Sequence, residues 1–286
     1  MRVVIYGLAK SGTTALFYKI KNSLPRDAVC LFEPRAFDPR AAKGRPLARL
    51  LRGGREPDVL AKVLPFRPAG AADAASFDGF DKQILLVRDP RDRVVSRTLY
   101  VAYHSTFYHR DAELAAFLGL LRKKEADPRA VPLAELLKTF ARLNGDRFSF
   151  DDWAADYARH SVRAPLDFHG CRPGLFVCKY EEMVGGRLGA LEAYLGLKLE
   201  AAASSVPAEH ARVARTKAGG NWRDWLTPED VGRLRPLMGP YLERYYADAD
   251  WDLSARPDIP SEFGSGYVLR IVNERRAAEG LPPFAG

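Results

Sequence analysis

Five short apolar runs alternate along the chain with longer segments of helical periodicity. The runs are rich in Val, Ile, Leu, Phe and Cys, as buried strands are, and cover residues 1–6, 28–32, 59–64, 83–88 and 174–179. Helical patterns cover 13–22, 91–100, 112–124, 133–143, 151–159, 181–195, 237–246 and 267–278. Thr227-Pro-Glu-Asp230 predicts one further helix start. This alternation predicts an α/β fold of three layers, a parallel β-sheet flanked by helices.

One segment interrupts the alternation of strands and helices. Between about residues 101 and 170 only helical patterns occur, which predicts a helical insertion. Residues 69–81 are rich in Ala, Asp and Gly and predict a surface connection. A chain of 286 residues can bury a large core, and the α/β pattern predicts a single domain over 1–286.

The polar end of the first strand carries a glycine turn, Gly7-Leu-Ala-Lys-Ser-Gly-Thr-Thr14. A strand that breaks into such a turn and then into a helix holds a phosphate, because backbone N–H groups and the helix N-terminus point at it. A Walker A loop has its lysine directly after the second glycine, whereas this chain has Thr13 there and Lys10 inside the loop. The displaced lysine argues against an ordinary Mg-dependent NTPase. It predicts a related phosphate cradle with different chemistry.

Polar residues at the ends of the other predicted strands indicate a site at the same edge of the sheet. Ligands of open parallel sheets bind beyond the carboxyl ends of the strands. Lys10 follows the first run, Glu33 follows the second and Arg88 ends the fourth, while Lys62 lies near the end of the third. The sequence therefore predicts a site with three cationic side chains and one carboxylate.

The composition of the chain limits the classes of partner that it is expected to bind. The net charge is +8 and the sequence pI is about 9.4, which favours anionic ligands. Part of the excess lies between residues 35 and 55, as a solvated helix face or as a basic lip over a ligand. Zinc-finger, homeodomain and RNP signatures are absent, so we expect no nucleic-acid partner. No apolar run approaches the roughly 20 residues of a membrane span, and no leader pattern precedes the first strand. We therefore expect a cytoplasmic protein without stable membrane insertion; the oligomeric state stays open.

Four ordered segments resemble sulfotransferases that use 3′-phosphoadenosine 5′-phosphosulfate (PAPS). Lys10-Ser-Gly-Thr-Thr14 is similar to the family's 5′-phosphosulfate loop. Leu86-Val-Arg-Asp-Pro-Arg-Asp-Arg-Val-Val-Ser96 resembles its 3′-phosphate motif, in which an Arg and a Ser eight residues later bind the extra phosphate. Lys179-Tyr-Glu-Glu-Met183, with Ala193-Tyr-Leu-Gly196, resembles the Lys-Tyr-Glu-Asp and Phe-Leu-Gly pattern. Arg215-Thr-Lys-Ala-Gly-Gly-Asn-Trp222 resembles the C-terminal signature, with its lysine displaced by one position.

The resemblance implies a fold like that of P-loop nucleoside triphosphate hydrolases and a PAPS-dependent sulfotransferase activity of the EC 2.8.2 type. The donor's sulfuryl group would pass to a hydroxyl acceptor, a carbohydrate or a small alcohol among the classes considered, without a metal. The implied nucleotide-binding residues are Lys10, Ser11, Gly12, Thr13, Thr14, Arg88, Ser96, Tyr180, Arg215 and Lys217. Tyr180 would stack on adenine, or else lie at the edge of the core.

The candidate general base differs from that of the cytosolic small-molecule members of the family. Those members carry a catalytic His two residues after the strand-end lysine. Lys62 matches the lysine, but Leu64 stands at the His position. Leu31-Phe-Glu-Pro34 resembles the Phe-Glu-Pro of carbohydrate and some bacterial sulfotransferases, so Glu33 is the candidate base. Partial burial would raise its pKa towards neutrality, or a nearby lysine would poise it. The alternatives are an ion pair of Glu33 with Arg35 or Lys62, and a base at His104 or His109.

In this scheme Lys10 stabilises the leaving oxygen and Lys62 the equatorial sulfonate oxygens. Two other functions remain open: an atypical P-loop kinase or NTPase, and a non-catalytic nucleotide- or nucleic-acid-binding module. Aromatic residues of the helical insertion line an acceptor pocket or belong to the core. They are Tyr103, Phe107, Tyr108, Phe140, Phe148, Phe150 and Trp153.

Overall fold

The computed structural model describes residues 1–40, 56–67, 70–199 and 218–286. Its contacts divide the chain into two compact units, each built from two segments. The first unit comprises Met1–Arg88 and Arg163–Ala211, and the second comprises Asp89–Val162 and Arg212–Gly286. The single domain over 1–286 stays a prediction.

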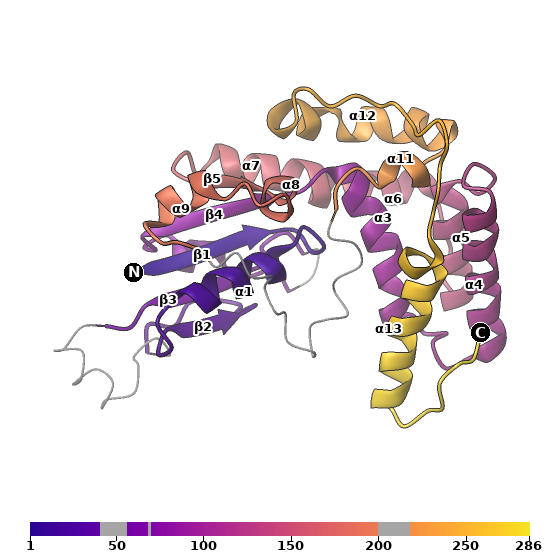
Figure 1. The fold of residues 1–286 in the computed structure, drawn as a ribbon, viewed down its shortest axis with the longest axis horizontal. Coiled ribbons are helices and arrows are strands. Elements are labelled where there is room, and N and C mark those ends of the chain that lie inside the picture. Colours follow the sequence, from indigo (N-terminus) through magenta and orange to yellow (C-terminus); the bar gives the residue numbers. More distant parts are fainter. Residues whose placement is uncertain (41–55, 68–69, 200–217) are drawn as a thin grey trace. The chain divides into compact units, whose positions relative to one another are not determined.

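The first unit contains a five-stranded sheet in which every pairing is parallel, in the order β2-β3-β1-β4-β5 (Figure 1). Its strands are β1 (Arg2–Gly7), β2 (Val29–Phe32), β3 (Val59–Val63), β4 (Lys82–Val87) and β5 (Phe176–Lys179). All five lie where the apolar runs predicted them. The α/β class with a parallel sheet is therefore confirmed.

The strand order creates a switch point between β1 and β4. After β1 the chain crosses towards β2 and β3, whereas after β4 it continues to β5 on the opposite side. Neighbouring strands whose connections diverge leave a crevice at their carboxyl ends, where ligands of α/β sheets bind. The glycine turn follows β1 and Arg88 follows β4, so the order of the strands brings these two segments together.

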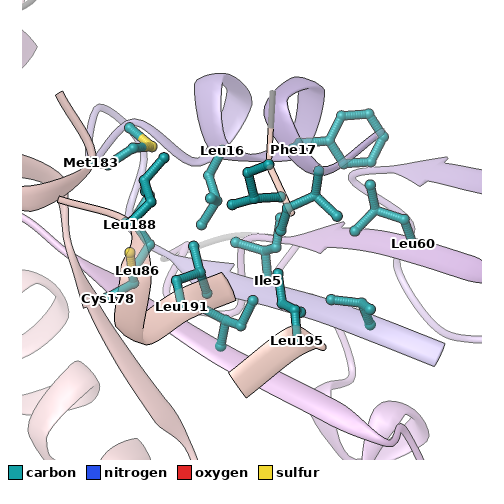
Figure 2. Close-up of a cluster of buried hydrophobic side chains, with 14 of the residues drawn as sticks. Ile5, Leu16, Phe17, Leu60, Leu86, Cys178, Met183, Leu188, Leu191 and Leu195 are labelled. Carbon is teal, nitrogen blue, oxygen red and sulfur yellow. The ribbon is translucent and has the colours of Figure 1, made fainter. Parts of the chain in front are cut away.

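Helices cover both faces of this sheet. On one face α1 (Thr13–Ser23), α8 (Tyr180–Val184) and α9 (Gly189–Leu195) contribute Leu16, Met183 and Leu191 to a core cluster that includes Ile5 and Leu60 (Figure 2). On the other face lies α7 (Ala164–Gly170), whose Phe168 ring meets the Tyr6 ring edge-on at 4.9 Å between centroids. The predicted three layers are thus present in this unit.

One predicted helix is wrong. The pattern over 181–195 forms two helices, α8 and α9, because the chain turns at Gly185 and Gly186. Gly186 has φ of +73°, a left-handed conformation that ends a helix and that glycine adopts without a steric penalty. The helical periodicity continues across the break, so the pattern alone did not reveal it.

The second unit is helical in its described parts. Its helices are α3 (Pro90–Tyr100), α4 (Asp111–Ala126), α5 (Leu133–Asn144), α6 (Phe150–Tyr157), α11 (Trp222–Trp225), α12 (Pro228–Tyr245) and α13 (Ser265–Ala278). Short 3₁₀ turns occur at Ala74–Phe77 in the first unit and at Val101–His104 and Ser261–Phe263 in the second, and a π-helical stretch at Ala158–Arg163. The helical character of the insertion is confirmed. The stretch 237–246 is the second half of α12 rather than a separate helix, and α11 was not predicted.

The predicted start of α12 is confirmed in detail. The Thr227 hydroxyl accepts a hydrogen bond from the Asp230 N–H at 3.1 Å, and the Asp230 carboxylate accepts one from the Thr227 N–H at 2.9 Å. This reciprocal capping box satisfies two helix-end donors. Asp230 also accepts from the Leu133 N–H at 2.9 Å, which ties the start of α12 to the start of α5.

Among the described helices, none has both the length and the apolar character needed to span a bilayer.

Candidate functional site

The glycine turn after β1 adopts a conformation that few residue types tolerate. A Cβ on Gly7 would lie 2.7 Å from Thr13 Cγ2 and 3.0 Å from the Leu86 carbonyl oxygen, so β4 and the helix start leave room only for glycine. Lys10 and Gly12 are both left-handed, with φ of +69° and +94°. Left-handed residues of this kind occur in the backbone nests that bind anions. The Ser11 N–H closes the turn by donating to the Leu8 carbonyl oxygen at 3.1 Å. Helix α1 begins directly after Gly12.

Arg88 and Tyr180 brace this turn from the β4 and β5 side. Nη1 of Arg88 donates to the Lys10 carbonyl oxygen at 2.9 Å, and the guanidinium lies 4.3 Å from the Tyr180 ring centroid. The same ring packs under the turn, since a Cβ on Gly12 would lie 2.4 Å from Tyr180 Cδ2. Both side chains are buried. Tyr180 therefore lies at the edge of the core here, and its stacking on adenine stays a prediction.

Two buried polar atoms at the turn, one on Ser11 and one on the neighbouring Arg88, lack a partner among the described residues. They are Ser11 Oγ and Arg88 Nε. Buried polar atoms are almost always hydrogen-bonded, to protein, water or ligand. An anion in the turn would supply an acceptor for both donors, which is the fit that a phosphate or phosphosulfate requires.

Lys62 connects the turn to the carboxylate that the sequence singled out. Its side chain is only 3% exposed, and Nζ donates to Thr14 Oγ1 at 2.9 Å and to Glu33 Oε1 at 2.7 Å. The ammonium also lies 4.0 Å from the centroid of the Phe32 ring. Burial lowers the pKa of Lys62, although the Glu33 carboxylate opposes this shift. The Glu33 carboxylate favours the charged form of Lys62.

Glu33 is held from two sides. Its N–H continues the β2–β3 ladder by donating to the Lys62 carbonyl oxygen at 2.9 Å, and its second carboxylate oxygen accepts from Arg67 Nη2. Burial, the largest single contribution, raises the pKa of Glu33, but the hydrogen bonds and charges of Lys62 and Arg67 outweigh it and lower the pKa overall. The expected shift towards neutrality is therefore wrong. Of the proposed ion pairs, the structure has the one with Lys62.

Arg67 was not predicted as part of this site, although its position in the sequence offered a signal. It is the first cationic residue beyond the end of β3. The Arg67 side chain is 47% exposed. Its ion pair with Glu33 is therefore more easily exchanged than the ion pair between Lys62 and Glu33.

Backbone strain marks two residues of the site. Among the described residues, only Lys10 and Glu33 combine a side chain with a positive φ, +69° and +54° respectively. Such conformations cost about 1–3 kcal/mol and persist where the surroundings enforce them, often at functional sites. Here the Arg88 hydrogen bond to Lys10 and the two ion pairs of Glu33 enforce them.

A cavity of about 340 Å³ lies beside Phe66, the residue that precedes Arg67. Its walls are largely apolar, and its polar residues are Asp167, Cys171 and Arg172. The other lining residues are Pro65, Phe66, Ala72, Ala74, Ala164 and Phe168. Phe66 directly precedes Arg67, and the Arg35 carbonyl oxygen accepts a hydrogen bond at 2.6 Å from the N–H of Asp73, between two lining alanines. The apolar walls are those of a small-molecule site, and the hollow opens widely to solvent.

The remaining predicted residues lie in the second unit or outside the described residues. Ser96 is buried on α3; because Arg88 ends the first unit, the pairing of Arg88 with Ser96 stays a prediction. Arg215 and Lys217 lie outside the described residues. His104 and His109 are exposed in the second unit, packed against Tyr103 and Tyr108. Within the described ranges, no group of three His, Cys, Asp or Glu side chains is arranged to hold a metal.

Comparison with known proteins adds little to this geometry. No protein-family model matches the chain, and no curated protein matches it in sequence. Among solved structures, the crystal structure of mouse sulfotransferase SULT7A1 complexed with PAP matches over 86% of each chain, at 17% identity and a TM-score of 0.46. Similarity at this level assigns neither a family nor a ligand to this chain.

The packing of Tyr180 under the turn makes Gly12 a sensitive position. We expect Gly12→Ala to destabilise the fold by about 2–4 kcal/mol, since left-handed strain and the clash with the Tyr180 ring add. Gly186→Ala is the matched control, because Gly186 has φ of +73° but a Cβ there would meet no atom within 4 Å. Gly186→Ala should lower the free energy of unfolding only by the left-handed strain, about 1–2 kcal/mol. Urea denaturation measures both, and equal losses would refute the close packing.

Proposed function

We propose that this chain is a sulfotransferase that transfers the sulfuryl group of PAPS to a hydroxyl acceptor. The observation that carries the proposal is the buried Lys62 ammonium, which joins Thr14 of the glycine turn to the Glu33 carboxylate. An anion-binding turn, a cation and a carboxylate then meet at the carboxyl edge of one sheet. Transfer of an anionic group to a hydroxyl needs these three components: a cradle, charge stabilisation and a proton acceptor.

Lys10, Ser11, Gly12, Thr13 and Thr14 would hold the 5′ end of the donor. Ser11 Oγ, which has no hydrogen-bond partner among the described residues, and the start of α1 directly after Gly12 support this assignment. Bound there, the donor supplies an activated sulfuryl group. Lys10 and the turn would stabilise the charge that develops on the leaving oxygen, and Lys62 would face the sulfonate oxygens.

Glu33 would accept the proton of the acceptor hydroxyl. Its lowered pKa keeps the carboxylate ionised near neutral pH, so a proton-accepting group is present without prior deprotonation. Two ion pairs also make it a weaker base than an isolated carboxylate. Release of the exposed Arg67 partner as an acceptor enters would restore basicity at the moment of transfer, while Lys62 holds the carboxylate in place.

The acceptor would occupy the cavity beside Phe66 and Phe168. The Phe66 and Phe168 rings meet edge-on at 5.2 Å between centroids, and small alanine side chains line much of the remaining wall. Such walls favour a flat, apolar body, because its apolar surface would be removed from water against the Phe66 and Phe168 rings. We therefore propose an alcohol with an aromatic or apolar body as the acceptor class.

Replacement of the proposed base tests the function directly. We expect Glu33→Gln to lower the turnover number for sulfuryl transfer by about 10²–10⁴-fold. Binding of 3′,5′-adenosine bisphosphate (PAP) should change little, because the amide oxygen still accepts from Lys62. Transfer from ³⁵S-labelled PAPS gives the rate, and calorimetry with PAP gives the affinity. Full turnover in the variant, measured with an accepted alcohol, would move the base elsewhere.

The pH profile provides an independent check on the same residue. Since the two cations lower the pKa of Glu33 beneath its ordinary 4.5, kcat/KM should stay level as the pH falls from about 7 to about 5. The activity would be lost only below the ordinary glutamate range, where the carboxylate binds a proton. A loss centred near pH ~6.5 would instead identify a histidine such as His104.

Narrowing the cavity tests the acceptor class. We expect Ala74→Phe to raise KM for an aryl alcohol by about tenfold or more, since the new ring occupies the space of the acceptor's body. PAP affinity should not change. Ala75→Phe is the control, because Ala75 is exposed and does not line the cavity. Equal KM values in the two variants would place the acceptor elsewhere.

A further inference from the structure

The second unit contains a cavity of about 200 Å³ to which α3, α5 and α6 all contribute residues. Four of its lining residues are aromatic and one is charged: Phe140, Phe148, Trp153, Tyr157 and Arg97. All the lining residues belong to the second unit, and none of them lines the cavity of the first unit. None takes part in the proposed sulfuryl transfer, so a ligand of this cavity would be a separate one.

The aromatic walls leave room for one flat ring. The Trp153 and Tyr157 rings stack at 5.2 Å between centroids, with 29° between their planes. The Phe140 ring meets the buried Phe107 ring edge-on at 5.5 Å between centroids, which ties this wall to the core. Since an apolar cavity of about 150 Å³ admits benzene, the larger cavity here has space for a single ring with a small substituent. Binding would remove the apolar surface of that ring from water.

Arg97 gives the cavity a positive charge that reaches solvent. Two other polar groups of the lining already have partners. The Thr98 hydroxyl donates to the Val94 carbonyl oxygen at 2.9 Å, and the Tyr157 hydroxyl donates to the Pro90 carbonyl oxygen at 3.1 Å. Among the described residues that line the cavity, none is a carboxylate. The charge of the lining is therefore complementary to an anion.

A second guanidinium charge lies close to Arg97. Although part of Arg97 is exposed, neighbouring groups remove the rest from water, and this desolvation lowers its pKa. The charge of Arg93 lowers the pKa of Arg97 further, while Tyr157 and Asp156 oppose the shift. The Asp156 side chain is 56% exposed and lies 3.5 Å from His160 Nε2. An anion beside Arg97 would offset the repulsion between the two guanidinium groups.

We propose that this cavity binds a small aromatic carboxylate, a single ring that carries one carboxyl group. The ring would lie against the aromatic walls, and the carboxylate would lie at the solvent side beside Arg97. A planar guanidinium matches a carboxylate with two parallel hydrogen bonds, which fixes the orientation of the ligand as well as its charge. The proposal does not depend on sulfuryl transfer.

Benzoate and its neutral isostere benzamide test the charge of the ligand. We expect calorimetry to show that the wild type binds benzoate about fivefold more tightly, the strength of a partly exposed ion pair. Arg97→Met should abolish this preference and leave benzamide unchanged. Arg142→Met is the matched control, because Arg142 is an exposed arginine on α5 that does not line the cavity. It should retain the preference.

A filled cavity tests the location of the ring. Ala141→Phe should weaken both ligands by about tenfold or more, since the new side chain occupies the space of the ring. Ala155→Phe should bind like the wild type, because Ala155 is exposed on α6 and does not line the cavity. Bound benzoate should also change the fluorescence of Trp153, and this change should disappear in Trp153→Phe. If Ala141→Phe fails to fold, Leu137→Phe fills the same cavity from one turn earlier on α5.

Four results would overturn the proposal. The first is a wild type that binds neither ligand at millimolar concentration, and the second is equal affinity for benzoate and benzamide. A preference for benzoate that survives in Arg97→Met would remove Arg97 from the site. Unchanged affinities in the folded Ala141→Phe or Leu137→Phe variant would place the ligand elsewhere.

Discussion

The burial of one ammonium group constrains the whole candidate site. Lys62 lies on the central part of the sheet with its side chain 3% exposed, where an unpaired charge would be prohibitively unfavourable. Its partners come from separate elements: Thr14 on α1, Glu33 beyond β2, and the Phe32 ring at the end of β2. To keep Lys62 satisfied, the turn, the sheet edge and the carboxylate must hold their relative positions. The chemistry we propose depends on that arrangement.

A second brace fixes the opposite side of the turn. Arg88 stacks on Tyr180 and donates to the Lys10 carbonyl oxygen, and the Tyr180 ring occupies the space that a side chain at position 12 would need. The turn is thus supported by β3 through Lys62 and by β4 and β5 through Arg88 and Tyr180. The positive φ angles of Lys10 and Glu33 are held by the Arg88 hydrogen bond and by the ion pair with Lys62. A preorganised cradle of this kind need not reorganise during transfer.

Much of the fold was predictable, because buried parallel strands are apolar runs and the capping box at Thr227 has a local signature. The interruption of the helix predicted over 181–195 was not predictable. The chain turns at two glycines there, but the helical periodicity of the apolar residues continues across them. The topology predicted that residues at the strand ends lie near one another, and Lys62 does contact Glu33 and Thr14. Their electrostatics could not be predicted in the same way: the direction of the Glu33 pKa depends on Arg67, which is distant in the chain from Glu33 and approaches it only in the fold.

A cradle for a phosphosulfate and a cradle for a triphosphate differ in where the loop lysine stands, and here Lys10 precedes the second glycine. The most direct measurement is therefore a calorimetric comparison of PAP with Mg-ATP on the wild-type chain. The account predicts that PAP binds at least about tenfold more tightly and needs no added magnesium, since the turn, Lys62 and the arginines supply the positive charge. Tighter binding of Mg-ATP, accompanied by its hydrolysis, would contradict the account and identify a P-loop kinase or NTPase.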